Sequence, residues 1–532
     1  VNKLYYDAYK KDMTAGTYPD VRSGLQKLLK DGLLLFNYTG HGGTTALSDE
    51  KVLTQTDINQ FTYTHLPVWV TATCDFTRFD DLNTSAGEDV FLNKSSGGIA
   101  LFTTVRVAYS RPNFPINDNV IRNLFERNNG RRRTLGEVMQ ATKNTLSSVY
   151  KLGFCLIGDP AVKMAYPEFG MKVTTVNGQS VDGNSISFKA LEKITVEGEV
   201  LDASGQLVTD FTGIVNPTVK DSKVTVTCLK NSNKDDSPAF TFTDYPNTIF
   251  IGNDSVRNGK FSFTFTVPKD ISYSNLQGKM NLYAVDTESG NEAQGNFDNF
   301  IVGGTSDTAE TDTIGPEIRA LYLNDTTFVD GGQVNTTPYF VAELWDKSGV
   351  NITGSSVGHD MMLVIDESTV LSYNLNSYYE LLPGEEGTGI VKFPIPALEP
   401  GKHTAEFWVW DILNNSTVRT FTFEVVEGLK PFLFDVIATP GIAREQVTFH
   451  LMHNRPESRM RVGIMVYDLA GRQLWKHEES GTSGLFENYT VSWDLTSGGA
   501  RMRPGVYIYR AAISTDNSKD ATKARKFIIL GE

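Results

Sequence analysis

The sequence predicts an α/β layered segment followed by a series of β-sandwich modules. Residues 1–166 alternate amphipathic helices with short, wholly apolar runs, which is typical of a parallel sheet covered by helices. Beyond residue 167 the helical periodicity fades, and short strands of alternating polarity are separated by turn clusters, as in β-sandwiches. The length of 532 residues accommodates roughly three to four domains.

Four helices are expected in the α/β segment, because apolar residues recur at helical spacing or follow a capping signal. In chain order the signals are Asp20 as a cap before Val21, Leu25, Leu28 and Leu29; the range 49–60; Ser85 with Glu88; and Thr134 with Glu137. The last two pairs have the Ser/Thr-x-x-Glu spacing of a capping box.

Three apolar runs, at 33–38, 67–73 and 97–105, are the predicted strands of this segment. A sheet ordinarily has about five or six strands. We therefore expect the chain to begin inside the α/β domain, with its N-terminal part and further strands lying upstream of Val1.

The remaining sequence divides into three predicted β modules. A polar stretch at 303–313 has the composition of a linker, and a second break falls at 427–431. The predicted domains are an α/β domain at 1–166, β-sandwich modules at 167–303 and 304–428, and a C-terminal β module at 429–532.

Charge and cysteine usage exclude several classes of protein. The formal net charge is −14, which argues against a nucleic-acid-binding protein, since that function needs a basic surface. The three cysteines, Cys74, Cys155 and Cys228, are too few for a disulfide framework and contain no Cys-x-x-Cys pair for zinc. Cys155 and Cys228 lie in apolar surroundings, and we expect both to be buried core thiols.

His41 and Cys74 carry the strongest chemical signal, because each directly follows an apolar strand. In an open parallel sheet, ligands bind in the crevice outside the carboxyl ends of the strands. Neighbouring strands lie about 4.8 Å apart, so an imidazole and a thiol at these ends would face one another. The imidazole can then take the thiol proton, which makes Cys74 a candidate nucleophile and His41 its candidate base.

Glycines flank the candidate base. Gly40 and Gly42 let the backbone turn sharply and approach a ligand closely. The backbone N–H groups of Gly42 and Cys74 are the candidate oxyanion donors. The alternative interpretation is a core histidine and a buried, unreactive cysteine.

Other polar residues near these strands are weaker candidates. Arg106 ends the third apolar run and is a candidate to hold a substrate carboxylate or carbonyl; the alternative is a plain surface arginine. Acidic residues close in sequence are candidates for a third group that orients the His41 imidazole. The alternative is that these residues form a solvated or calcium-binding acidic loop. These residues are Asp75, Asp80, Asp81 and Glu88.

Two histidines of the β region are considered as metal ligands. His359 stands next to Asp360, and His403 is considered with Asp411. Neither histidine has a second one at a recognised metal-site spacing. We therefore assign no metal ion and no cofactor.

Several segments of the α/β part carry a family resemblance. Asn37–Gly42 and Ala72–Cys74 resemble the His and Cys segments of gingipain-type cysteine peptidases. Asp75–Asp81, Ser85–Glu88 and Gly158–Ala161 resemble one branch of that family, the cell-surface sortases of the bacterial type IX secretion system. The resemblance implies a caspase-like fold for the α/β segment and a Cys-His dyad made by Cys74 and His41.

The resemblance extends through the β region. Gly349–Asn351, Gly358–Asp360 and Trp410–Asn415 match a region of the sortase branch that gingipains lack. Pro504–Tyr507 and the final Phe527–Leu530 resemble a type IX C-terminal signal domain. The acidic specificity residues of gingipains would lie upstream or be absent, so no primary-specificity pocket is assigned.

The family implies a cysteine transpeptidase at the extracellular face of the bacterial outer membrane. Cys74 would cut cargo proteins before their C-terminal signal domains through a thioester, and an amine on anionic lipopolysaccharide would take the acyl group. The implied partners are the outer-membrane barrel PorV, bound through the C-terminal domain, together with PorQ and PorZ. The alternatives are a secreted endopeptidase, in which water is the acceptor, and a catalytically silent surface adhesin.

Overall fold

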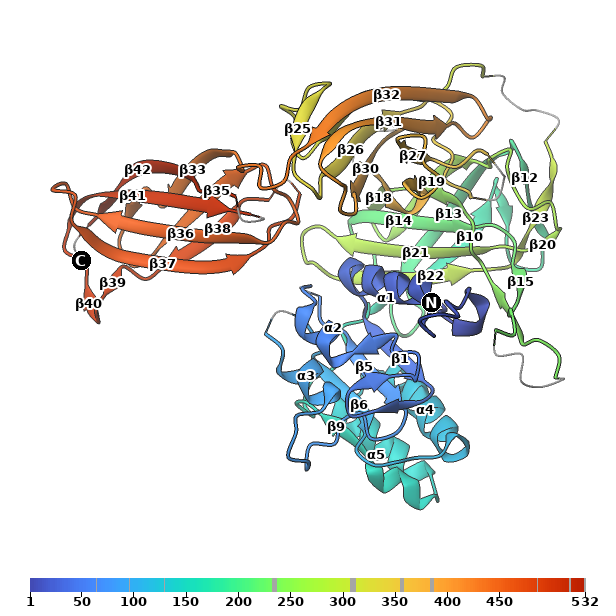
Figure 1. Cartoon of the computed structure of the whole chain (residues 1–532). Helices are drawn as coiled ribbons and strands as arrows, with labels where there is room; N and C mark the ends of the chain where they lie inside the picture. The colour runs from blue at the N-terminus through green and yellow to red at the C-terminus, as the bar shows by residue number, and fades with distance from the viewer. Residues whose placement is uncertain are drawn as a thin grey trace.

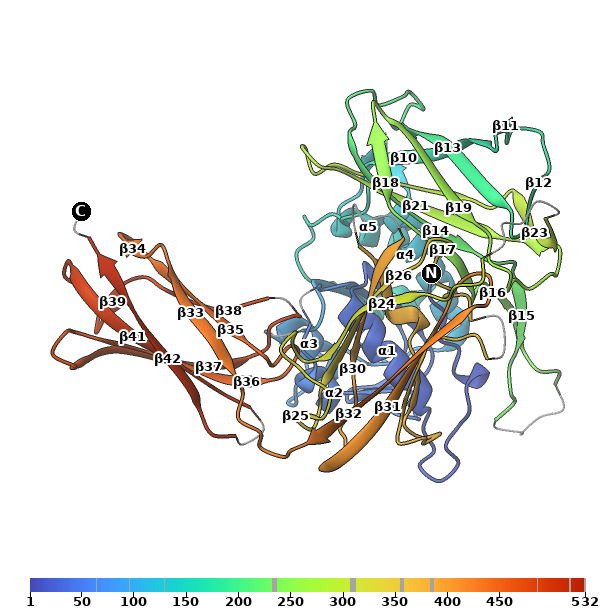
Figure 2. The same cartoon turned by 90° about the horizontal axis from the view of Figure 1, so that it is seen from above.

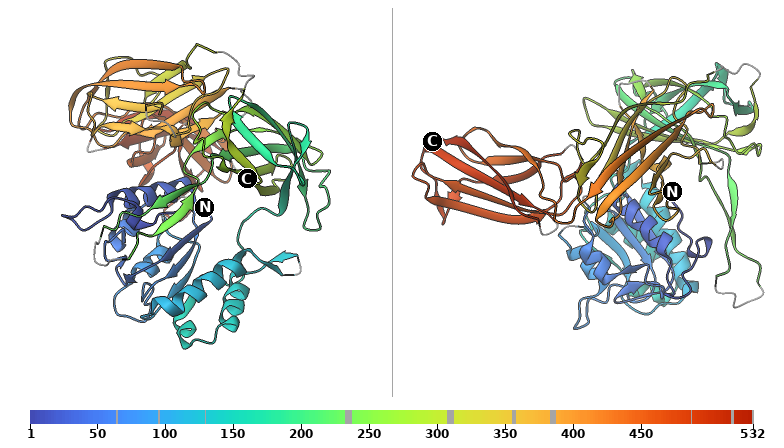
Figure 3. Two further views of the ribbon diagram at one scale, coloured as in Figure 1. Left: turned by 90° about the vertical axis from the view of Figure 1, so that its right-hand side faces the viewer. Right: turned by 45° about the horizontal axis from the view of Figure 1, so that its top comes forward.

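The computed structural model describes residues 1–63, 65–94, 96–128, 130–231, 237–306, 312–354, 358–382, 387–485, 487–515 and 518–530. It shows an α/β segment, two β modules beside it and a last β module that projects away from the other three (Figure 1). Views from other directions show the same separation (Figures 2 and 3). The predicted linker at 303–313 falls partly outside the described residues.

A four-stranded sheet forms the centre of the α/β segment. Its order is β1 (Leu35–Thr39), β5 (Val68–Ala72), β6 (Ala100–Thr104) and β9 (Phe154–Ile157). The first three strands are parallel and correspond to the three apolar runs. The fourth, which the sequence analysis did not anticipate, runs antiparallel to β6.

Helices cover both faces of this sheet, which explains why β5 and β6 are buried along their whole length. On one face, Trp69 and Leu101 pack with the side chains of α1 (Pro19–Asp31) and α3 (Ala86–Leu92). On the other face, Val70 and Phe102 pack with α4 (Ser110–Phe125) and α5 (Leu135–Thr145). No helix in the described part of the chain is both long and apolar enough to cross a membrane.

The capping boxes at Ser85 and Thr134 are confirmed as the starts of α3 and α5. The expected cap Asp20 was wrong: Tyr18 is the N-cap of α1, and Asp20 lies in the first turn after Pro19, which fixes the helical φ there.

The expected helix over 49–60 is only partly present. Thr54 caps the short α2 (Gln55–Gln60), and its hydroxyl and backbone exchange hydrogen bonds with Asp57. The preceding residues form a small antiparallel sheet instead, because they return to pair with the chain that follows His41. Its strands are β2 (Gly42–Gly43), β3 (Ala46–Leu47) and β4 (Leu53–Thr54).

The first β module is built on one long sheet, in which β10 and β22 also pair in parallel over two residues. In order, the long sheet contains β11 (Gln179–Ser180), β10 (Phe169–Val176), β13 (Lys193–Leu201), β19 (Lys260–Thr266), β18 (Asp254–Arg257), β14 (Gly213–Lys220), β21 (Lys279–Asp286) and β22 (Glu292–Phe297), and β17 (Thr248–Ile251) pairs with β14. A smaller sheet contains β12 (Ile186–Ala190), β23 (Phe300–Thr305) and β20 (Leu276–Gln277). Inward-facing residues alternate along these strands and form one core.

The second and third β modules each pack two sheets around a core of their own. The second has β24 (Glu317–Leu323), β26 (Tyr339–Trp345), β30 (Thr388–Pro394) and β29 (Tyr379–Leu381) against β25 (Gly332–Val334), β32 (Ser416–Val425), β31 (Gly401–Trp410), β27 (Met362–Ile365) and β28 (Ser372–Asn374). The third has β33 (Leu433–Thr439), β35 (Val447–His453) and β38 (Tyr489–Trp493) against β34 (Ile442–Ala443), β42 (Ala521–Ile529), β41 (Gly505–Ser514), β36 (Met460–Tyr467) and β37 (Gln473–Gly481).

The N-terminal residues of the α/β segment are held by the first β module. The Asp7 carboxylate accepts hydrogen bonds from the backbone N–H groups of Lys230 (2.9 Å) and Asn231 (2.8 Å). Tyr5 packs edge-on against Phe242, with ring centroids 4.6 Å apart. The contacts lie at a hairpin made of β15 (Val224–Thr227) and β16 (Thr241–Asp244).

Candidate active site

The register of the central sheet places His41 and Cys74 at equivalent positions. Strands β1 and β5 are parallel neighbours, as the sequence analysis supposed, and Thr39 is paired with Ala72. His41 and Cys74 each come two residues after this pair, at the carboxyl edge of the sheet. The backbone stays in register as it leaves the strands, because the Gly40 N–H donates to the Ala72 carbonyl at 3.4 Å.

The turn that carries Cys74 is anchored on both sides. The Cys74 carbonyl accepts hydrogen bonds from the Thr104 hydroxyl at the end of β6 and from the Phe76 N–H, the latter at 2.9 Å. The Cys74 thiol is half-buried and donates to the Ala108 carbonyl at 3.5 Å. The thiol therefore lies beside the loop that joins β6 to α4.

The imidazole of His41 is exposed, whereas its backbone is fixed. The His41 carbonyl accepts from the Ser48 N–H at 2.8 Å and from the Tyr38 hydroxyl at 2.5 Å. Burial and the neighbouring Tyr6 raise the pKa of Tyr38 above its ordinary value, so this hydroxyl stays a donor across the physiological range.

The residue after His41 has no room for a side chain. A Cβ at Gly42 would lie 2.3 Å from the Thr73 hydroxyl oxygen, well inside van der Waals contact. His41 and Ser48 lie opposite one another on the two antiparallel segments and are joined by a backbone hydrogen bond. The next pair of opposite residues is Gly42 and Leu47. In an antiparallel ladder that second pair is not hydrogen-bonded, so the Gly42 N–H points away from β3 and stays available as a donor.

The acidic residues considered for orienting His41 are held elsewhere, which corrects that expectation. Asp75 and Asp81 lie 3.7 and 3.4 Å from the Arg78 guanidinium. Asp80 pairs with Arg106, and Glu88 accepts from the Ser85 N–H at 2.7 Å as part of the α3 capping box. Among the described residues, no hydrogen bond or ion pair joins the His41 imidazole to any of these four acids.

Arg106 is present at the end of β6, but its guanidinium already has a carboxylate partner. One nitrogen donates to Asp80 at 3.0 Å and the second contacts the other Asp80 oxygen, so the pair is bidentate. The same side chain donates to the Val105 carbonyl at 2.7 Å. Arg106 therefore ties its own loop to the loop after Cys74, and contact with substrate stays a prediction.

The two remaining thiols differ from one another. Cys228 is buried as expected, at 5% exposure, and burial raises the pKa of its thiol. Cys155 is only half-buried, contrary to the prediction, because it belongs to β9, which is the edge strand of the sheet.

The histidines of the β region do not pair as the sequence suggested. His359 Nδ1 lies 2.6 Å from the Asp270 carboxylate of the first β module, and His403 Nδ1 lies 2.7 Å from Asp366. Asp411 is instead fully buried beside Asp346 and Asp312, with a carboxylate oxygen of each within 4.8 Å of the others. Asp312 and Asp346 were not among the candidates from the sequence, because neither lies at a spacing that is recognised for metal ligands.

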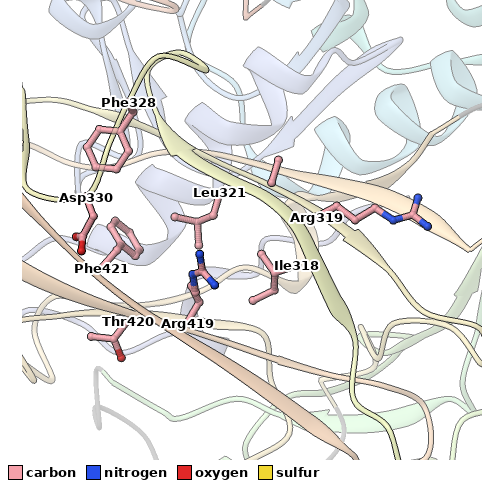
Figure 4. A pocket seen from close by; sticks show the side chains of 9 residues that line it. Ile318, Arg319, Leu321, Phe328, Asp330, Arg419, Thr420 and Phe421 are labelled. Carbon is pink, nitrogen blue, oxygen red and sulfur yellow. The ribbon is translucent and has the colours of Figure 1, made fainter.

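A cavity of about 510 Å³ lies in the second β module, between β24 and β32. Figure 4 shows its lining, with Leu321, Phe328 and Phe421 around the interior. Arg319 points away from the cavity and donates to the Thr388 hydroxyl at 3.1 Å. None of the lining residues belongs to the α/β segment, so this cavity is separate from the site at His41 and Cys74.

The comparisons with known proteins bear on both parts of the chain. Residues 1–165 match the model of peptidase family C25. The crystal structure of dimeric latent PorU from Porphyromonas gingivalis is similar at 34% sequence identity, with a TM-score of 0.34, over 97% of this chain and 47% of that one. The chain thus spans about half the length of that PorU chain. No curated protein matches.

Gingipain structures are also similar, at lower identity. The Arg-specific cysteine proteinase gingipain R matches at 19% identity with a TM-score of 0.26, over 53% of this chain and 56% of that one. The complex of Porphyromonas gingivalis RgpB pro- and mature domains matches at 20% identity with a TM-score of 0.25, over 53% of this chain and 57% of that one.

Proposed function

Residues 1–165 match peptidase family C25 and the chain is similar to PorU, and from that premise we propose that it is a cysteine transpeptidase of the bacterial cell surface. Its substrates are type IX secretion cargo proteins with a C-terminal signal domain. It removes that domain and joins the cargo to an amine on anionic lipopolysaccharide.

The register of β1 and β5 is the single observation that carries the proposal. Two parallel neighbours in register present His41 and Cys74 at one edge of the sheet, each two residues past the Thr39–Ala72 pair. A Cys-His pair on one crevice is the arrangement that nucleophilic acyl transfer requires. The Gly42 N–H, which points away from its ladder, and the Cys74 N–H supply donors for the oxyanion.

The proposed reaction has two acyl transfers. His41 takes the Cys74 proton, and the thiolate attacks the carbonyl carbon of the peptide bond before the signal domain. The tetrahedral oxyanion then collapses, the C–N bond breaks, and His41 returns the proton to the leaving amine. The resulting thioester is attacked by the acceptor amine, whose proton passes to His41 as the Cys74 thiolate leaves.

The proposed location is the extracellular face of the outer membrane, with PorV bound through the C-terminal module and PorQ and PorZ in the same complex. This part rests on the PorU similarity and on the signal-domain resemblance of Pro504–Tyr507 and Phe527–Leu530. The C-terminal module projects from the rest of the molecule, which supports a docking role because most of the module stands clear of the other three (Figure 2).

The test replaces Cys74 by Ala in the native cell, with Cys155→Ala as the matched control thiol. We expect Cys74→Ala cells to accumulate uncleaved cargo without lipopolysaccharide, whereas Cys155→Ala cells process cargo normally. Normal, anchored cargo in Cys74→Ala cells would rule out the proposed function. If the intact protein cleaves cargo but leaves it unmodified with acceptor supplied, the activity is that of an endopeptidase instead.

A further inference from the structure

A buried amide on α4 binds the peptide unit that precedes the candidate nucleophile. The side-chain Nδ2 of Asn113 donates to the Thr73 carbonyl at 2.9 Å. Asn113 is 4% exposed and lies in the first turns of α4, and Thr73 is 1% exposed at the end of β5. This contact joins a helix to the residue directly before Cys74.

The bond fixes the direction of a second group, the Cys74 N–H. The Thr73 carbonyl and the Cys74 N–H belong to the same peptide unit, which is planar and trans. In such a unit the C=O and N–H point in opposite directions. Because Asn113 binds the carbonyl from the side of α4, the Cys74 N–H must point away from α4.

The helix that carries Asn113 cannot easily shift relative to β5. Ile116 and Val120 of α4 are fully buried in the same core as Val68 and Val70 of β5. The position of the amide is therefore set by the packing of a helix on a sheet, which varies far less than the position of a loop.

The contact is retained at a cost to hydrogen bonding. The Asn113 Oδ1 and the Thr73 hydroxyl are buried with no partner among the described residues. A buried acceptor or donor without a partner destabilises the folded state, because it has lost its hydrogen bonds to water. An apolar residue at position 113 would avoid the cost at Oδ1, so the amide points to a role that an apolar residue could not fill.

We infer that Asn113 is a positioning residue for the oxyanion donor: it holds the Thr73–Cys74 peptide unit so that the Cys74 N–H faces the tetrahedral intermediate. The inference rests on the proposed acyl-transfer function. Asn113 itself touches no reacting atom. Its effect is confined to steps in which negative charge develops on a carbonyl oxygen, because only these steps use the N–H.

The test compares two reactions of the same thiol in the full chain. Acylation by p-nitrophenyl acetate passes through an oxyanion, whereas alkylation by iodoacetamide does not. We expect Asn113→Leu and the isosteric Asn113→Asp to lower the Cys74-dependent acylation rate by about 10- to 100-fold. The Cys74 alkylation rate, measured at the same pH, should stay within about twofold of the original protein.

Asn123→Leu is the matched control. Asn123 lies on the same helix, is 8% exposed, and donates through Nδ2 to the Asn119 carbonyl at 2.8 Å. The Asn123→Leu substitution removes a buried amide of the same kind at the far end of α4. The acylation and alkylation rates of Cys74 should therefore both remain unchanged.

Two outcomes would overturn the inference about Asn113. Equal loss of acylation and alkylation would show a general structural role, and unchanged acylation would show that the amide is not needed. If Asn113→Leu fails to fold, as judged by its thermal transition, Asn113→Asp decides. If p-nitrophenolate release by the original protein equals that of Cys74→Ala, the proposed function fails, which is distinguishable from a defect confined to the Asn113 variants.

Discussion

At the scale of single residues, the site depends on small side chains as much as on reactive ones. Gly42 allows the loop after His41 to lie directly on the end of β5, where the Thr73 hydroxyl fills the space that a Cβ would need. The residue after the candidate base and the residue before the candidate nucleophile thereby lie against one another. Position 42 should consequently tolerate no larger residue.

Replacing Gly42 by Ala places a methyl group 2.3 Å from the Thr73 hydroxyl oxygen, so the His41 loop must move. We expect a loss of about 1–3 kcal/mol in the free energy of unfolding, measured by urea denaturation, and at least a tenfold drop in Cys74-dependent acylation. The double variant Gly42→Ala/Thr73→Ala removes the clashing atom and should recover part of both losses. Additive losses in the double variant would contradict this account.

The two candidate catalytic residues could be singled out from the sequence because each directly follows an apolar run. The contacts of the loops around them could not be predicted. Asp80 and Arg106 are 26 positions apart and meet only because β5 and β6 are adjacent. Asn113 was missed because it lies in Arg-Pro-Asn-Phe-Pro, where two prolines obscure the start of α4. The spacing of Ile116, Val120 and Leu124 was the signal available for that helix.

At the scale of elements, the connections of the second β module bring three carboxylates together. Asp346 follows β26, Asp411 follows β31, and Asp312 precedes β24. Burial, helped by the nearby Asp411 and Asp312 and opposed by the hydrogen bonds from the Gly349 and Ser348 N–H groups, raises the pKa of Asp346 to about 6. Burial also raises the pKa of Asp411, whereas backbone and Ser348 hydrogen bonds lower that of Asp312.

Because the pKa of Asp346 is raised in the folded state, the free energy of unfolding should decrease as the pH rises and this carboxyl ionises. A carboxyl that binds its proton more tightly in the folded state destabilises the fold when ionised, and this penalty disappears as the pH falls through 6 toward 4. In chelator-containing buffer, Asp346→Asn should be more stable than the original protein at pH 7.5, by roughly 2–3 kcal/mol. The difference should fall to about 1 kcal/mol near pH 4.5 and approach zero only below the ordinary pKa of 3.8.

Chemical denaturation at a series of pH values measures this difference directly. Asparagine keeps an oxygen to accept from Ser348 and Gly349, whose N–H groups each lie 2.8 Å from the Asp346 carboxylate. Titrating groups outside the cluster of Asp312, Asp346 and Asp411 cancel, because both proteins share them. A difference that does not change between pH 4.5 and 7.5 would refute the assignment.

At the scale of the whole molecule, polar contacts join the modules. Asp270 of the first β module accepts from Asn414 at 2.9 Å and from Asn351 at 3.3 Å, and it pairs with His359. The sequence analysis singled out Asn351, His359 and Asn414 in three separate motifs. Their convergence on one carboxylate could not be predicted, because it depends on how two independently folded cores meet. The boundaries at 166, 303 and 428 stay predictions.

The contact between the N-terminal residues and the first β module can be tested by replacing Asp7 with Ala. Its carboxylate accepts three hydrogen bonds from Lys230 and Asn231, and its removal deletes all three. We expect faster amide hydrogen exchange over residues 1–11 and 224–231, corresponding to a loss of about 1–3 kcal/mol in local stability.

Asp12→Ala is the control for this variant, since within the described part of the chain the Asp12 carboxylate accepts only from the nearby Thr14 and Ala15. Exchange at 224–231 should not change in that protein. Equal exchange at 224–231 in Asp7→Ala and in the original protein would show that the contact contributes nothing.

The hydrogen bonds between Asp7 and Asn231 also constrain the order in which the molecule folds. The partners are separated by 224 positions, so the first residues of the chain cannot complete their contacts until the hairpin through Asp244 has been synthesised. Closing so long a loop is slow compared with forming the helices and neighbouring strands between them. The contacts of residues 5–7 with the first β module are therefore completed late, after both strands of that hairpin have paired.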